Sequence, residues 1–141
     1  MAMRLRSAHS PPRGMTLVEV CAVMAVIGIV TALAWPSQLA QLQRARRLDA
    51  MAALTRLQFA QERHRAQAGV YSADLSAVGA ARSGEGLYDL SLRDATGETV
   101  TLAARARDDG AQRGDMECRE LTLRLNQGLA DQGPSGRCWG Q

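Results

Sequence analysis

The strongest constraint in the sequence is an apolar segment at residues 15–35, MTLVEVCAVMAVIGIVTALAW, in which Glu19 is the only charged residue. A helix of this length rises about 31 Å, enough to span the hydrocarbon core of a bilayer. The stretch before it contains Arg4, Arg6 and Arg13 and no acidic residue. The sequence therefore predicts a membrane-spanning helix that follows a basic leader.

A helical pattern continues beyond the apolar segment. Residues 37–68 are more polar, but apolar side chains still recur at helical spacing, and Gly69 is a suitable C-cap. Pro36 is the only interruption, and we expect it to kink the helix rather than end it. The pattern predicts one helix of more than fifty residues, apolar all round in its first half and amphipathic in its second. The stripe of the second half comprises Leu39, Leu42, Ala50, Ala53, Leu54, Leu57 and Ala60.

The rest of the chain changes to a strand-like period. Apolar and polar residues alternate at residues 87–92, less cleanly at 99–106, and clearly at 121–125, which predicts antiparallel strands. Thr96-Gly97 suits a hairpin turn, and residues 107–117 form a longer loop. The glycine-rich tail from Gln127 is expected to be irregular unless it is tied down. The fold class is therefore α+β, with a long helix on a small sheet of three to four strands.

The three cysteines differ in context. Cys21 lies in the apolar segment, whereas Cys118 and Cys138 lie in polar sequence rich in turns, so only the latter two are candidate partners. A bridge between them would close a loop of about twenty residues, contribute roughly 3 kcal/mol and imply an oxidising compartment. Two unrelated free thiols are the alternative. A metal site would need further Cys or His at close spacing, and the sequence has none there.

The charge pattern argues against one class of function. All seventeen basic residues are arginine, and without the first fourteen residues the chain has as many arginines as acidic residues. A nucleic-acid-binding domain driven by bulk charge is therefore not expected, and DNA or RNA is a possible but unsupported partner. The basic triplet Arg44, Arg46 and Arg47 could meet lipid headgroups, acidic neighbours or DNA, although a solvated helix face is the default interpretation.

The segment RGMTLVE, residues 13–19, combines a basic leader that ends in glycine with an apolar helix start and one acidic residue. It resembles the class III signal of type IV prepilins. The resemblance implies that a prepilin peptidase cleaves after Gly14 and that the new terminal amine, on Met15, is N-methylated. Gly28 and Pro36 fall where the helix of this family commonly has a glycine and a proline that break or kink it.

Glu19 is predicted to act in assembly. A carboxylate within a membrane helix costs a few kcal/mol near the bilayer centre, so such a residue usually has a partner. In the first turns of the trimmed helix it also lies at the positive end of the helix dipole. The resemblance supplies the partner, which is the cationic N-terminus of a neighbouring subunit. An acidic residue that merely snorkels to the interface is the alternative.

The segments YSADL, CRELTL and the terminal GRCW are similar to those of minor pilins of type IV pili. The resemblance implies the pilin fold, with a leader at 1–14, an assembly helix at 15–36, its amphipathic half at 37–69, and a loop, sheet and disulfide-bounded region at 70–141. The implied location is the bacterial inner membrane, with the C-terminal domain in the periplasm, and then the filament. The implied partners are other pilin subunits, the prepilin peptidase and methyltransferase, the inner-membrane assembly machinery and, before assembly, membrane lipid.

Three alternatives remain. A pseudopilin of a type II secretion system shares the leader and the helix. Cleavage after Ala34 by a general signal peptidase would release a soluble periplasmic module, and a lipoprotein anchored through Cys21 would need small residues before that cysteine. No nucleotide-binding, serine-hydrolase or zinc-protease motif occurs, so we expect neither enzyme activity nor a cofactor.

Overall fold

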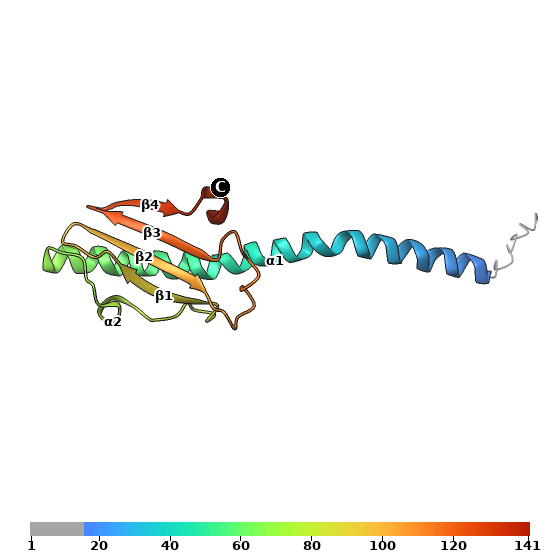
Figure 1. The fold of residues 1–141 in the computed structure, drawn as a ribbon, viewed down its shortest axis with the longest axis horizontal. Coiled ribbons are helices and arrows are strands. Elements are labelled where there is room, and N and C mark those ends of the chain that lie inside the picture. The colour runs from blue at the N-terminus through green and yellow to red at the C-terminus, as the bar shows by residue number, and fades with distance from the viewer. Residues whose placement is uncertain (1–15) are drawn as a thin grey trace, which may run out of the picture. The chain divides into compact units, whose positions relative to one another are not determined.

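A computed structural model describes residues 16–141, so the predicted processing site at Gly14 and Met15 lies outside the described residues. The chain divides into two compact units between Ser37 and Gln38. The elements are α1 (Leu17–Ala68), α2 (Leu75–Val78), β1 (Tyr88–Arg93), β2 (Thr99–Ala106), β3 (Glu120–Asn126), β4 (Leu129–Gly133) and the short 3₁₀ helix η1 (Gly136–Trp139), as Figure 1 shows.

The first half of α1 has the composition of a membrane helix. It contains an 18-residue window with a mean hydropathy of 2.5, which is long and apolar enough to cross a bilayer. The helix begins at Leu17 because the Thr16 hydroxyl accepts a hydrogen bond of 3.3 Å from the Glu19 backbone N–H. Glu19 therefore lies in the first turn, where the helix dipole favours a negative charge.

Neither predicted break ends this helix. The residues from Leu17 to Ala68 are helical throughout, including Gly28 and Pro36. The Thr31 hydroxyl donates to the backbone carbonyls of Ile27 and Gly28, so the polar side chain in this apolar half is satisfied within the helix. A kink at either position stays a prediction.

The second half of α1 buries most of the predicted stripe. Its buried members are Ala50, Ala53, Leu54 and Leu57, and Ala60 is partly buried. The first two members of the stripe, Leu39 and Leu42, are helical but 53% and 45% exposed. They precede the part of the helix that contacts the sheet. Helical spacing alone could not distinguish them from the residues of the stripe that pack in the core. Gly69 ends the helix with φ at 79°, and its N–H donates to the Arg65 carbonyl at 2.8 Å.

The four strands form one antiparallel sheet in the order β1-β2-β3-β4. The register pairs Leu90 with Ala104 and Ala104 with Leu121, so the alternating apolar residues of three strands face the same way. They pack on the buried stripe of α1 and form the core, in which Leu54, Tyr88, Val100, Leu102, Leu121 and Leu125 are almost completely buried. The predicted α+β pilin architecture is confirmed.

The connection after α1 is held by a buried amide. The Gln61 side chain donates to the Ser72 carbonyl and accepts from the Ser72 N–H, both at 2.9 Å. This pair of bonds explains why a polar residue is fully buried beside the apolar stripe. Asp74 then caps the single turn of α2 by accepting a bond from the Ser76 N–H at 2.9 Å. It also accepts a bond of 2.7 Å from the Ser76 hydroxyl, and the hydroxyl bond, followed by the N–H bond, lowers the pKa of the Asp74 carboxyl.

The tail is more regular than predicted. Residues 129–133 form β4, which pairs with β3 through a tight turn at Gln127 and Gly128. Both turn residues have positive φ, 48° and 89°, as a two-residue hairpin turn requires. Most of β4 is exposed, so its residues lack the apolar alternation that identifies the other strands.

Candidate functional site

The C-terminal region is closed by the predicted disulfide. Cys118, just before β3, is bonded to Cys138 in η1 with an S–S distance of 2.01 Å, and both cysteines are buried. The loop between them contains β3 and β4. The bond therefore fixes η1 and its flanking residues next to the start of β3. Cys21 is a free, exposed cysteine in the first unit.

The long loop between β2 and β3 is docked on α1 by a buried ion pair. Arg47 donates to both carboxylate oxygens of Asp115, through Nε at 2.6 Å and Nη2 at 2.7 Å. The Gln112 side chain donates to Asp115 and to the Gln43 carbonyl, at 2.9 and 3.0 Å. The hydrogen bond with Asp115 raises the pKa of Arg47, so the guanidinium stays protonated although it is buried.

This docking gathers five arginines, which we call the arginine cluster. Arg44, Arg46 and Arg47 come from α1, Arg113 from the docked loop, and Arg137 from η1. Arg46 donates to the Ala111 carbonyl at 3.1 Å, and Arg47 donates to the Arg137 carbonyl at 3.5 Å. Arg113 is flanked by two residues that lie against α1. Gln112 donates a hydrogen bond to the Gln43 carbonyl, and Gly114 lies near the Gln43 side chain.

The arginine cluster has more positive than negative side chains. Among the described residues, two carboxylates pair with it, Asp115 with Arg47 and Glu117 with Arg137. Within residues 16–141, Arg44, Arg46 and Arg113 have no carboxylate within 4.0 Å. The neighbouring Asp108 and Asp109 pair with other arginines of the loop, Arg119 and Arg107. Three guanidinium groups are thus left to attract an anion.

On the outer face of the sheet, by comparison, the positive and negative charges are balanced. The register places three arginines there with three acidic residues, namely Arg93, Arg105 and Arg124 with Asp89, Glu120 and Asp131. Arg93 and Glu120 form a bidentate pair at 2.8 and 2.9 Å that reaches across β2. Ala103 lies between them in the register and is fully buried, so a larger side chain there would obstruct the pair.

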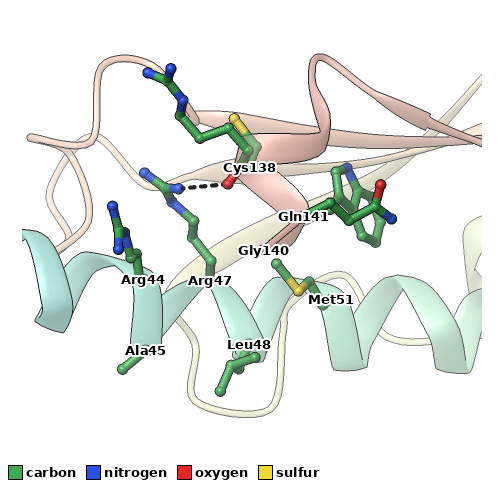
Figure 2. Close-up of a pocket in the computed structure, with 10 residues that line it drawn as sticks. Arg44, Ala45, Arg47, Leu48, Met51, Cys138, Gly140 and Gln141 are labelled. Atoms are coloured by element: carbon green, nitrogen blue, oxygen red, sulfur yellow. Dashed lines mark hydrogen bonds between the residues drawn. The ribbon is translucent and has the colours of Figure 1, made fainter.

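Two pockets border the arginine cluster. One, of about 470 Å³, lies between α1 and the C-terminal turn and has an apolar wall that includes Met51 and Trp139 (Figure 2). The other, of about 570 Å³, is polar and extends to Asp115 and Glu117. Arg44, Arg47 and Arg137 line both pockets. A basic ridge therefore separates an apolar pocket from a polar one.

Several of these residues were not found from the sequence. Asp115 and Arg137 follow no sequence pattern, because they contact α1 across 68 residues or more. Arg113 lies in the loop that Asp115 docks. The triplet Arg44, Arg46 and Arg47 is evident in the sequence, where a solvated helix face is the default interpretation and lipid headgroups, acidic neighbours or DNA are the alternatives. Arg47 is instead buried. In the part of the chain that the structure describes, no group of three His, Cys, Asp or Glu could hold a metal ion.

A family model described as "Type IV minor pilin ComP, DNA uptake sequence receptor" matches residues 36–122, more than half of the chain. The matched range contains four of the five clustered arginines and ends before η1. A search of curated proteins finds no match.

Proposed function

Because the chain belongs to the family of the type IV minor pilin ComP, the DNA uptake sequence receptor, it is a structural subunit of a type IV pilus, and we propose that its arginine cluster binds DNA during uptake. The observation that carries this proposal is the local excess of guanidinium groups at Arg44, Arg46 and Arg113.

DNA phosphates are the ligand class that this surface fits. Proteins bind duplex DNA largely by replacing the counterions of the phosphates with Lys and Arg side chains. Arginine also binds phosphate through two parallel N–H groups, which favours it over a simple point charge. The expectation from bulk charge was drawn from a body with about zero net charge. It does not account for a fold that holds five acidic residues in ion pairs with arginines outside the cluster, while three arginines of the cluster have no carboxylate partner within residues 16–141.

The pilus function uses the first half of α1. An apolar N-terminal helix anchors pilins in the membrane before they enter the filament, and this helix is long enough for that role. We propose that a prepilin peptidase cleaves after Gly14, that Met15 becomes N-methylated, and that the C-terminal domain faces the periplasm. Glu19 in the first turn would then pair with the terminal amine of a neighbouring subunit.

The proposed role is binding and assembly rather than catalysis. A pilin is a structural protein, and the arginine cluster has no nucleophile with an adjacent base. The buried Asp115 carboxylate is held by Arg47 and Gln112. We propose that the chain is not an enzyme and that its partners are other pilin subunits, the assembly machinery and DNA.

DNA binding is tested with the full chain in nanodiscs of zwitterionic lipid, titrated into a labelled duplex at several salt concentrations. The triple variant Arg44→Gln, Arg46→Gln, Arg113→Gln should bind more weakly, and the slope of log affinity against log salt should fall by up to about 3, or about 1 per lost phosphate contact. The matched control is Arg56→Gln, Arg105→Gln, Arg124→Gln, which removes the same charge from arginines that also lack a carboxylate partner within residues 16–141. Equal weakening in both variants would show that net charge alone matters.

Processing is tested separately by the intact mass of protein extracted from membranes. A chain that begins at Met15 and carries one extra methyl group is the expected result. A chain that begins at Trp35 would contradict both the cleavage site and the membrane anchor.

A further inference from the structure

We propose that the apolar pocket beside the arginine cluster accepts the base of an unpaired nucleotide, with the phosphates of the same strand on Arg44 and Arg137. This inference rests on the proposed function, since it assumes that DNA reaches this surface. It adds that the protein prefers DNA with unpaired bases. A receptor that contacts only the phosphates of a duplex would show no such preference.

The pocket offers a flat wall. Trp139 and Met51 line it from η1 and α1, and its volume of about 470 Å³ lies within the range of small-molecule sites. The indole N–H of Trp139 donates to the Gly133 carbonyl at 2.9 Å, which fixes the orientation of the ring. The side chain packs against the hydrophobic core, is only partly buried and lines the pocket. A held aromatic ring is the usual platform on which a base stacks.

The charges are placed for a strand rather than for an isolated base. Arg47 is committed to Asp115 and the Arg137 carbonyl, whereas Arg44 has no carboxylate partner among the described residues. Arg137 has only a single contact of 3.3 Å with Glu117, and both side chains are about 70% exposed. An exposed pair of this kind contributes little and can give way to a phosphate.

The two adjacent pockets suit the two parts of a nucleotide. Arg44 and Arg137 border both the apolar pocket and the polar one. A strand whose phosphate lies on this ridge could place a base in the apolar pocket while its backbone continues over the polar pocket. A paired base in a duplex cannot do so without first leaving the stack, which costs a few kcal/mol.

The experiment uses the full chain with Trp35→Phe, which leaves Trp139 as the only tryptophan, in nanodiscs of zwitterionic lipid. Short oligothymidylate, an abasic strand of equal length, and a duplex of equal length are titrated separately. We expect oligothymidylate to quench the Trp139 fluorescence and to bind about tenfold more tightly than the abasic strand, as one stacked base would give. The duplex should bind without comparable quenching.

Two matched variants distinguish binding in the apolar pocket from binding to the arginines of the ridge. Met51→Gln, which changes the apolar wall, should weaken oligothymidylate binding several-fold and leave duplex binding unchanged. Met116→Gln makes the same change in the polar pocket and should have little effect on either. Thermal unfolding checks that both variants are folded.

Two results would overturn the inference. Equal affinity for the oligothymidylate and abasic strands without quenching would exclude base stacking, and the proposed function would still stand if the duplex bound with the expected salt dependence. A change in Trp139 fluorescence caused by anionic phosphatidylglycerol in the nanodisc without DNA, with no further change when oligothymidylate is added, would assign the pocket to a lipid headgroup instead.

Discussion

Arg47 and Asp115 form a bidentate ion pair between α1 and the loop that precedes β3, with both side chains more than nine-tenths buried. Arg47 is the buried member of the arginine cluster, and its pair with Asp115 positions the loop that contains Arg113. It therefore affects both the stability of the domain and the arrangement of its charges.

Removing one partner of this pair should be costly. Asp115→Asn leaves the Arg47 guanidinium buried without a counter-charge, and we expect the free energy of unfolding to fall by about 3–5 kcal/mol. Replacing both residues, as Arg47→Met with Asp115→Leu, should restore much of that loss because no buried charge remains. Thermal denaturation followed by circular dichroism measures both. A single variant as stable as the parent would mean that water reaches the pair.

Glu117→Gln is the matched test at the exposed ion pair. Its effect on stability should be below about 1 kcal/mol, because Glu117 and Arg137 are both solvent-exposed. DNA affinity should rise about two- to fivefold, since Arg137 is released and one negative charge leaves the surface. Fluorescence anisotropy with a labelled duplex measures this change. Weaker binding in this variant would contradict the role of Arg137 in contacting phosphate.

The stability should fall at alkaline pH because of Tyr88. Burial raises the pKa of Tyr88 to about 12, whereas a tyrosine in the unfolded chain ionises near 10. The fold favours the neutral phenol, so its contribution is fully present below about pH 10 and is lost as the pH rises from 10 to 12, by roughly 2–3 kcal/mol in total.

Tyr88→Phe is the control for this loss, and melting temperatures across that pH range provide the measurement. The loss should become smaller in the variant but not vanish, because burial and a hydrogen bond with Glu62 also raise the pKa of Tyr71. An unchanged pH profile in Tyr88→Phe would assign the alkaline transition to other groups.

The Cys118–Cys138 bond should stabilise the C-terminal region. Cys138→Ser opens a loop with a sequence separation of 20 residues, and we expect a loss of about 3 kcal/mol and a fall of several degrees in the melting temperature. Hydrogen exchange should increase first in β4 and η1, while β1 and α1, which pack in the core, should change less. Uniform loss of protection across the sheet would show that the whole domain depends on the bond.

Glu19→Val separates filament assembly from membrane insertion. The substitution removes a charge from the apolar segment, so the precursor should still insert and be processed. Its recovery in sheared pili should fall, because a neighbouring terminal amine would lose its partner. Recovery equal to that of the parent would contradict the pairing role of Glu19.

The sequence by itself determined the elements that rest on periodic burial. The apolar segment, the α1 stripe from Ala50 to Leu57, and the strands β1 to β3 follow from spacing, because each buries one face of a regular element. The positive φ of Gly69 and the proximity of the two buried cysteines were also accessible, since Gly and Cys have specific structural uses. The turn residues Gln127 and Gly128 indicate a hairpin that leads into β4. The residues of β4 are mostly exposed and do not alternate, so the strand itself has no apolar pattern.

Only the tertiary structure decided where the charges lie. Arg47 belongs to a basic triplet in the sequence, yet it is buried against Asp115, 68 residues away, while Arg44 stays exposed. Ion pairs and docked loops follow no period, because they depend on which surfaces the packed core brings together. The balanced composition of the chain therefore concealed a local excess of arginine, which arises when the loop at Arg113 and the turn at Arg137 dock beside α1.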